Sequence, residues 1–310
     1  MRAGDESESA RDGGARMHMG HVALRVTDLE ASADHLAGTL GLRRTFEAPG
    51  VLALSSNEKH HEVEFLHADA PALDHVGLEV EDVNELERLR DALIASGARI
   101  LSESAQEPGL HRAIRALGPS DLVFEIYTGM EREPLSVERY MPRLARRFGH
   151  LNLASEDYLE TRHFLIAVLG FRVTDVLGET VTWLRCDRDH HGIALRHAAA
   201  NSLHHYAFEV EGWEAIQRYA DQLARLGKRL IWGPGRHGPG RNLYTYTPDP
   251  DNAIVEAYAD LLVIADERSY VPIDWSERGA DALNLWGPPP PSDYRDYGVP
   301  VRPPPDGRSG

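Results

Sequence analysis

The sequence predicts an α+β fold in which four βαβββ modules form two open, cup-shaped barrels. The main observation is a short strand motif, with alternating apolar residues and a histidine near its start, that occurs four times. The copies are GHVALRV from Gly20, DHVGLEV from Asp74, GHLNLAS from Gly149 and HHYAFEV from His204. Equivalent residues of the two halves keep a nearly constant offset: 129 residues for His21 and His150, 130 for His75 and His205, and 131 for Glu125 and Glu256. Such a constant offset indicates that one folding unit was duplicated twice.

The first half contains the expected elements of two modules. In order, these are a strand at 20–26, a helix at 29–39, strands at 42–47, 50–55 and 62–67, a strand at 74–80 and a helix at 83–96. Apolar residues spaced three and four apart predict the helices. Asp28 and Asp82 are the expected N-caps. Gly41 and Gly97 stand just beyond the expected helix ends, where glycine is the usual terminating residue.

The second half repeats this order and completes the predicted domain organisation. Its modules are expected at 148–197 and 203–260, with helices at 156–169 and 212–226 that stop at Gly170 and Gly227. The resulting domains are a disordered tail at 1–17, an N-terminal two-module domain at 18–130, a linker at 131–147, a C-terminal two-module domain at 148–262 and a Pro-rich arm at 263–310. We expect the arm to lie over a domain or a neighbouring subunit.

Composition limits the partners and the chemistry. The formal net charge of -16 argues against nucleic acid or an anionic membrane surface as a partner. No apolar run is long enough to span a bilayer, and the acidic start of the chain lacks the apolar core of a signal peptide. The single cysteine, Cys186, excludes a disulfide framework and fits the reducing cytoplasm, where we expect the protein to reside. Histidines and carboxylates therefore remain as metal ligands.

His150, His205 and Glu256 form a candidate metal-binding set in the second half. Strand residues alternate in and out, so a histidine early in a first strand and a glutamate late in a last strand can point into one cup. Two histidines and one carboxylate form the facial triad that suits Fe(II) and leaves coordination positions open. Their homologous positions in duplicated modules make the set more specific than two histidines and a glutamate alone.

The stretch GPGRHG, followed by LYTYTPDPDNAIVEAY, resembles a motif of the type I extradiol catechol dioxygenases of the vicinal oxygen chelate superfamily, in the homoprotocatechuate and catechol 2,3-dioxygenase-like branch. The resemblance covers residues 17–262 and implies the glyoxalase-like fold of that superfamily. It implies iron ligands at His150, His205 and Glu256, catalytic residues at His191, His237 and Tyr246, and substrate and oxygen pocket residues at Asn152 and Trp183.

Two of these assignments involve a choice between neighbours. His205 is preferred to His204 because the other module openings align on it. Tyr246 is preferred to Tyr244 because it keeps the three-residue step to Asp249 that the family motif has.

The resemblance implies an Fe(II)-dependent dioxygenase, with Mn(II) as the alternative metal, that opens a catechol with O2 to a muconic-semialdehyde-type product. Tyr246 and His237 would hydrogen-bond the catecholate, and His191 would be the acid/base, a role for which its pKa need only lie near neutrality. No other cofactor is expected, and family members are commonly oligomers, so we expect a homo-oligomer.

The sequence also predicts a substrate without a carboxylate. Trp232, which we include among the pocket residues, stands where relatives that act on carboxylate-bearing catechols have an arginine. The arm reads ERGADALNLWG and lacks their arginine pair. These bidentate carboxylate partners are therefore missing, although Arg236 or Arg278 remain as substitutes.

In the first half, His21, His75 and Glu125 occupy the homologous ligand positions. Arg115, however, stands at the position of Tyr246, and the Tyr…Asp-Pro element is missing. We therefore expect a non-catalytic N-terminal domain, and the sequence leaves open whether it binds a second metal. Two other functions also remain open: a metal-free protein that sequesters a small ligand, and a different reaction on the same fold, such as glyoxalase-type isomerisation.

Overall fold

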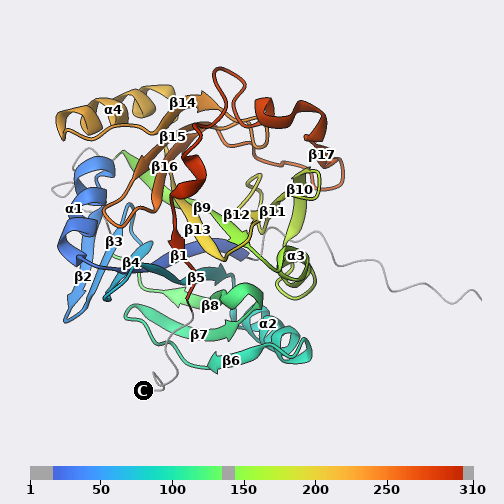
Figure 1. The fold of residues 1–310 in the computed structure, drawn as a ribbon. Coiled ribbons are helices and arrows are strands. Elements are labelled where there is room, and N and C mark those ends of the chain that lie inside the picture. The colour runs from blue at the N-terminus through green and yellow to red at the C-terminus, as the bar shows by residue number, and fades with distance from the viewer. Residues whose placement is uncertain (1–16, 135–143, 303–310) are drawn as a thin grey trace, which may run out of the picture.

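The computed structural model describes residues 17–134 and 144–302, which form two large sheets with helices on their outer sides (Figure 1). The predicted disorder of the N-terminal tail and most of the predicted linker lie outside these residues. Two predicted boundaries differ from the structure. Met17, expected in the N-terminal tail, belongs to the first strand, and Ala145, expected in the linker, begins the ninth strand.

The first sheet contains eight strands and is built from the first half of the chain. Its elements are β1 (Met17–Val26), α1 (Leu29–Leu40), β2 (Arg43–Ala48), β3 (Val51–Ser55), β4 (Val63–His67), β5 (Ala72–Val80), α2 (Val83–Ala95), β6 (Arg99–Ser102), β7 (Leu110–Leu117), the 3-10 turn η1 (Pro119–Asp121) and β8 (Val123–Met130). The strand order is β2-β3-β4-β1-β5-β8-β7-β6. Because β1 and β5 pair antiparallel at the centre, the two βαβββ modules join through their first strands.

The second sheet repeats this plan with ten strands. Its elements are β9 (Ala145–Ser155), α3 (Tyr158–Ala167), β10 (Arg172–Leu177), β11 (Val181–Arg185), β12 (Ile193–His197), β13 (Ser202–Val210), α4 (Gly212–Arg225), β14 (Trp232–Arg236), β15 (Leu243–Pro248) and β16 (Ile254–Ala259). The order β14-β15-β16-β13-β9-β12-β11-β10 matches that of the first sheet module by module, with β9 and β13 paired antiparallel. The predicted α+β fold of tandem βαβββ modules is therefore confirmed.

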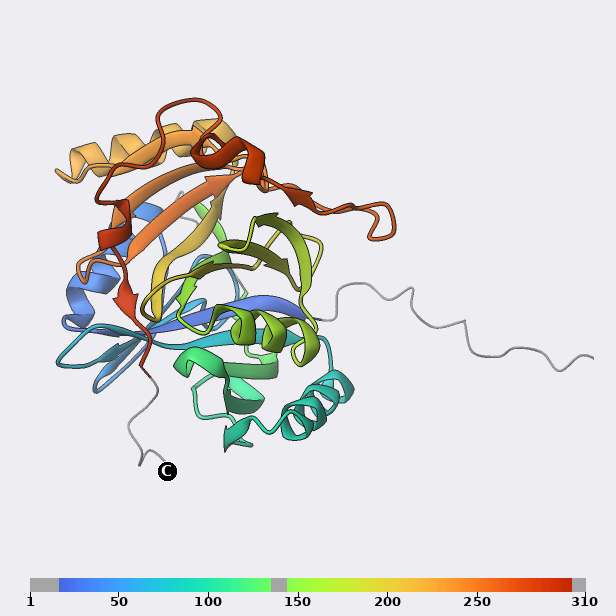
Figure 2. The ribbon, with the colours of Figure 1, turned by 45° about the vertical axis from the view of Figure 1, so that its right-hand side comes forward.

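The C-terminal arm adds two short strands to the second sheet and lies over its own chain (Figure 2). Its elements are β17 (Ile273–Asp274), η3 (Ser276–Ala282), η4 (Tyr294–Asp296) and β18 (Val299–Pro300). β17 pairs with β10 at the sheet edge, whereas β18 pairs with β13 near the centre. Val301 then forms a bridge with Leu73 of β5 in the first sheet.

Local sequence explains how the first two helices begin. The Asp28 side chain accepts a hydrogen bond from Ala31 N at 3.0 Å, and the Asp82 side chain accepts one from Glu85 N at 2.9 Å. Gly41 ends α1 with a φ of 75°, a left-handed conformation that glycine adopts without strain. Both predicted N-caps are thus confirmed.

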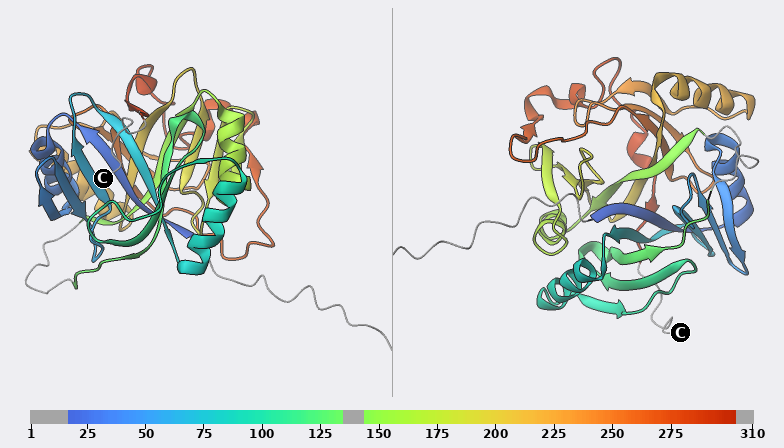
Figure 3. Two further views of the ribbon diagram at one scale, coloured as in Figure 1. Left: turned by 90° about the horizontal axis from the view of Figure 1, so that it is seen from below. Right: turned by 180° about the vertical axis from the view of Figure 1, so that it is seen from behind.

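The two sheets pack against each other through β1, β5, β9 and β13, as two further views show (Figure 3). One apolar core cluster contains residues of both halves, including Leu24 and Leu153. Buried polar contacts also cross the boundary: Phe148 N donates to Glu62 Oε1 at 2.9 Å, for example. Within the described ranges, no helix has the length and apolar character needed to cross a membrane.

Candidate metal centre

Strand pairing brings His150, His205 and Glu256 together on three adjacent central strands of the second sheet. His150 on β9 and Glu256 on β16 both lie opposite Ala207 of β13, and His205 lies two residues before Ala207 on the same strand. His150 Nε2 is 2.9 Å from Glu256 Oε2, and His205 Nε2 is 3.2 Å from the same oxygen. One ligating atom from each residue lies within 4.8 Å of the others, and all three residues are buried.

The hydrogen bonds of His205 leave its Nε2 free to bind a cation. The carbonyl of Tyr294 can only accept, so His204 Nε2, 2.9 Å away, must donate to it. In a neutral His204 the Nδ1 atom then accepts, and the His205 Nδ1 atom, at 3.0 Å, is the donor. Burial lowers the pKa of His204 to about 4 and that of His205 well below its ordinary value, so both rings are neutral. The His205 Nε2 atom therefore carries a lone pair, as a metal ligand requires.

This arrangement directs two acceptors at each other. The lone pair of His205 Nε2 faces the Glu256 carboxylate at 3.2 Å, which is unfavourable unless a proton or a metal ion lies between them. The other carboxylate oxygen of Glu256 accepts a hydrogen bond from Asn242 Nδ2 at 3.2 Å. Glu256 is fully buried, and an uncompensated buried carboxylate is costly. The donor set therefore fits a divalent metal ion.

A cavity of about 50 Å³ adjoins these three atoms. Every site residue that the sequence predicted lines this cavity: His150, Asn152, Trp183, His191, His205, Trp232, His237, Tyr246 and Glu256. Ala194, Pro239, Leu283 and Tyr294 complete the wall. Within the part of the chain that the structure describes, no arginine or lysine lines this cavity. Arg236 instead pairs with Asp260, and Arg278 lies over the ring of Trp275.

His237 and Tyr246 form a hydrogen-bonded pair in the cavity wall. His237 Nε2 lies 3.0 Å from the Tyr246 hydroxyl, and His237 Nδ1 donates to the carbonyl of Leu283 at 2.5 Å. Burial lowers the pKa of His237, so the ring is neutral and its Nε2 accepts from the tyrosine. Burial and the nearby Glu256 raise the pKa of Tyr246 well above its ordinary value, so its phenol stays protonated. In this arrangement the phenol proton is held by His237, so the pair can donate to a substrate only when the phenol turns, which also frees His237 Nε2 to take up a proton.

His191 stands at the end of a chain of hydrogen bonds that starts at Asp175. His190 Nε2 lies 3.1 Å from Asp175 Oδ2, and His190 Nδ1 lies 3.1 Å from His191 Nδ1. The Asp175 carboxylate can only accept, so His190 Nε2 is the donor. In a neutral His190 the Nδ1 atom then accepts, and the donor to it is His191 Nδ1. Its Nε2 then carries a lone pair. Burial and the neighbouring His150 lower the pKa of His191 well below neutrality, contrary to the value expected from the sequence, so this residue begins as a base.

Three contributors to the site were missed by sequence reasoning. Asn242 lies before the Tyr-containing strand, and its type alone gives no signal of a contact with Glu256. Asp175 supports His190 from β10, but its counterpart at the 130-residue offset is Thr45, so the repeat gives no hint of its role. Tyr294 comes from the irregular arm, where no periodic pattern places it against His204.

The paired modules and the site identify the family. The model of the Glyoxalase/Bleomycin resistance protein/Dioxygenase superfamily matches residues 18–126 and 147–257, which is both halves of the duplicated chain. The chain belongs to this superfamily. The matched segments contain the two equivalent ligand triplets, so the family model covers both cups.

Three named proteins are similar to this chain over most of its length. The chain is 29% identical to a metapyrocatechase of Pseudomonas sp. (strain CF600), over 84% of this chain and 90% of the relative. It is 25% identical to a manganese-dependent 2,3-dihydroxybiphenyl 1,2-dioxygenase of Geobacillus genomosp. 3, over 86% and 92% of the two chains. Homoprotocatechuate 2,3-dioxygenase from Arthrobacter globiformis has the same fold, with a TM-score of 0.84, 23% identity, and coverage of 94% of this chain and 95% of that one.

Proposed function

We propose that this superfamily member is an extradiol ring-cleaving dioxygenase that opens a catechol with O2 at a mononuclear Fe(II) site. The convergence of His150, His205 and Glu256 in the wall of a cavity is the observation that carries the proposal. Three protein ligands on one side leave positions for a chelating diol and for dioxygen, as the facial triad of non-heme Fe(II) oxygenases does. The names of the relatives, which include a metapyrocatechase, support the same reaction class.

When bound, the ferrous ion would supply the Lewis acidity that acidifies a chelated catechol hydroxyl and the redox path between catecholate and dioxygen. The protein groups manage the protons. His191 is neutral and presents its Nε2 lone pair, so it can accept a hydroxyl proton and later return it. Tyr246 keeps its proton, and by turning it from His237 Nε2 to the catecholate oxygen the phenol would donate a hydrogen bond to the substrate and free His237 Nε2 to accept a proton.

The substrate proposed is a catechol without a carboxylate. Trp232 stacks on Tyr246 with ring centroids 5.6 Å apart and an interplanar angle of 15°, so the wall beside the catalytic pair is aromatic. Arg236 and Arg278, the substitutes that the sequence left open, are engaged elsewhere. A carboxylate buried against this wall would lack the ion pair that offsets its desolvation.

Iron is proposed over manganese because of the ligand set, and a manganese-dependent relative makes Mn(II) the first alternative.

A homo-oligomer is proposed as well. Trp213 and Trp286 lie exposed side by side on the surface, with ring centroids 6.0 Å apart and half of each side chain accessible, which is typical of an interaction surface.

Anaerobic reconstitution tests the proposal. The chelator-stripped protein is loaded with Fe(II) or with Mn(II), and O2 uptake and coloured ring-fission products are followed with alkyl-, aryl- and carboxyl-substituted catechols. We expect turnover with Fe(II), preference for catechols without a carboxylate, and loss of turnover in Glu256→Gln. Tight catechol binding without O2 uptake by either metal form would instead favour a sequestering protein, and isomerase activity would favour the glyoxalase alternative.

A further inference from the structure

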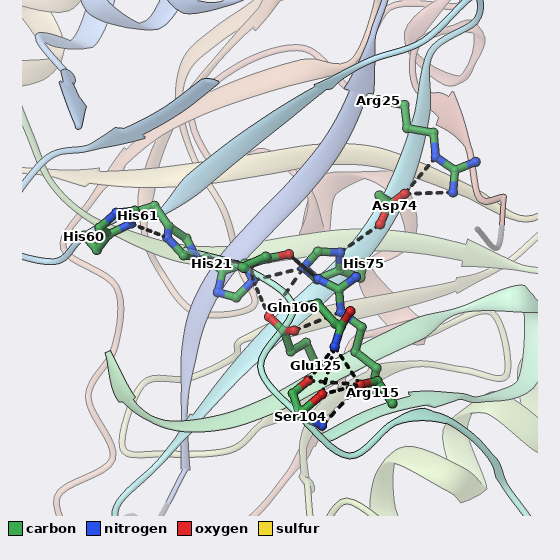
Figure 4. A network of polar contacts seen from close by, with 12 residues as sticks. His21, Arg25, His60, His61, Asp74, His75, Ser104, Gln106, Arg115 and Glu125 are labelled. Carbon is green, nitrogen blue, oxygen red and sulfur yellow. Dashed lines mark hydrogen bonds and ion pairs between the residues drawn. The ribbon is translucent and has the colours of Figure 1, made fainter. Parts of the chain in front are cut away.

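The first half of the chain contains a second cluster of ligating side chains, none of which takes part in the proposed reaction. His21 of β1, His75 of β5 and Glu125 of β8 converge in the first cup, as the close view shows (Figure 4). A fourth residue, Glu107, joins them from the segment between β6 and β7. We propose that these four residues form a second, closed divalent-metal site, best suited to Zn²⁺.

The separations of the four ligating atoms fit one ion. His21 Nε2 lies 3.1 Å from His75 Nε2, 3.3 Å from Glu107 Oε2 and 3.4 Å from Glu125 Oε2. Zinc ligands at roughly 2.1 Å in tetrahedral geometry lie about 3.4 Å apart. All four residues are buried, and the two Oε2 atoms accept no hydrogen bond from the described residues. His61 Nε2 also lies 3.4 Å from Glu107 Oε2. Two buried carboxylate oxygens that accept no hydrogen bond, with histidine nitrogens around them, indicate a missing cation.

The hydrogen bonds behind the cluster prepare His75 as a ligand. Its Nδ1 atom donates to Asp74 Oδ1 at 2.9 Å, and Asp74 is itself held by Arg25 Nε at 2.7 Å. The Nε2 atom of His75 faces an acceptor, Glu107 Oε1, at 2.7 Å, so in the apo protein a proton lies between these two atoms, and a metal ion would take the place of that proton. A carboxylate that orients a histidine in this way is the usual support of a zinc ligand.

Arg115 orients the carboxylates of the cluster and also lies 3.4 Å from His75 Nε2. Its guanidinium donates to Oε1 of Glu125 at 2.8 Å and to Oε1 of Glu107. The two Oε2 atoms are then directed toward His21. In the strand register Arg115 lies opposite Glu125, as Tyr246 lies opposite Glu256. The first half therefore has an arginine that orients carboxylates where the second half has the proposed catalytic tyrosine.

The surroundings indicate a structural role for this ion. A cavity of about 550 Å³ lies next to the cluster, and Glu107 is the only one of the four ligands in its wall. In the second half, by contrast, all three ligands line the cavity. Four protein ligands without an open position characterise structural zinc sites, whereas catalytic sites keep a position free.

Metal stoichiometry of the full chain tests this proposal independently of turnover. Chelator-stripped protein is equilibrated with Zn²⁺ alone, desalted and analysed by native mass spectrometry. We expect two ions per chain in the wild type, one in Glu256→Gln, one in Glu125→Gln and none in the double variant. Tyr127→Phe is the matched control, because this buried tyrosine packs on His21 and its hydroxyl has no hydrogen-bond partner among the described residues. It should keep both ions.

Co²⁺ added to Glu256→Gln should also give the intense visible absorption of a four-coordinate site. The proposal is overturned if the wild type holds one ion and Glu256→Gln none, because Arg115 and protons would then be the only cations in the first cup. It is equally overturned if Glu125→Gln still holds two ions. The Glu256→Gln result decides the question even if the first-half variants do not fold, and neither result depends on dioxygenase activity.

Discussion

Replacing Asn242 by leucine should weaken metal binding in the second half without unfolding the protein. Asn242 is fully buried and donates to Glu256 Oε1, the carboxylate oxygen that does not face the histidines. The leucine has a similar size but no donor, so this oxygen would lose its partner. The charge of Glu256 would then be less well compensated, and the side chain would be free to rotate away from His150 and His205.

The size of the effect follows from the geometry. Loss of a group that supports a metal ligand typically costs roughly 10- to 100-fold in affinity, or about 1.4–2.8 kcal/mol. The 3.2 Å separation from Asn242 Nδ2 to Glu256 Oε1 is at the long end for an N–H···O bond, which places the expected loss near tenfold.

Competition with a fluorescent chelator under anaerobic conditions measures this change in Fe(II) affinity. The relevant site is the one whose Fe(II) binding is lost in Glu256→Gln. Thr245→Val is the control, because Thr245 is also buried on β15 but its hydroxyl donates to the backbone carbonyl of Ala257 at 3.0 Å. An affinity within threefold of the wild type in Asn242→Leu, or an equal loss in Thr245→Val, would refute the role assigned to Asn242.

Three further predictions concern single side chains. His191→Phe should retain the metal while lowering kcat by roughly 10²- to 10⁴-fold, because it removes the base but no ligand; single-turnover kinetics with measured metal content check this, and loss of the metal would contradict it. Asp249 has a pKa raised to about 7, mainly by burial, so the folded apo protein holds a proton there that the unfolded chain releases near pH 4. Its contribution to the free energy of unfolding should therefore fall as the pH rises from about 4 to about 7, by at most about 1.4 kcal/mol per pH unit. Urea unfolding of the wild type and of Asp249→Asn across this range checks this, because the variant should lack this pH-dependent component. Gly149→Ala should lower the free energy of unfolding by about 1–3 kcal/mol, because the added Cβ would overlap the hydroxyl of Tyr258, which packs on His150; an unchanged urea midpoint would show that the site relaxes freely.

The duplicated pattern was sufficient to predict the fold and the convergence of the three candidate ligands in the second half. Residues at repeated strand positions, such as His150 and Glu256, are brought together by strand register alone, and register follows from alternation and module order. The predicted helix N-caps Asp28 and Asp82 likewise depend only on local sequence.

What the sequence could not predict depends on contacts between distant segments. The roles of Asp175 and Tyr294 arise because the arm folds back: Trp275 Nε1 donates to Asp175 Oδ2 at 2.7 Å, and Tyr294 reaches His204. Glu107 stands 130 residues before His237, but a glutamate in place of that histidine gave no sign of a fourth ligand in the first half. The pKa of His191 depends on burial among other histidines, which composition does not give.

The C-terminal arm contributes to the wall of the substrate cavity but not to the metal-ligand set. The arm supplies Leu283 and Tyr294 to the cavity wall but none of the three atoms that would hold the ion. Substitutions there can reshape the entrance and the range of aromatic rings admitted while the inorganic centre stays intact. Because β18 is also bound to β13, the strand of His205, shortening the tail would disturb selectivity and ligand placement together.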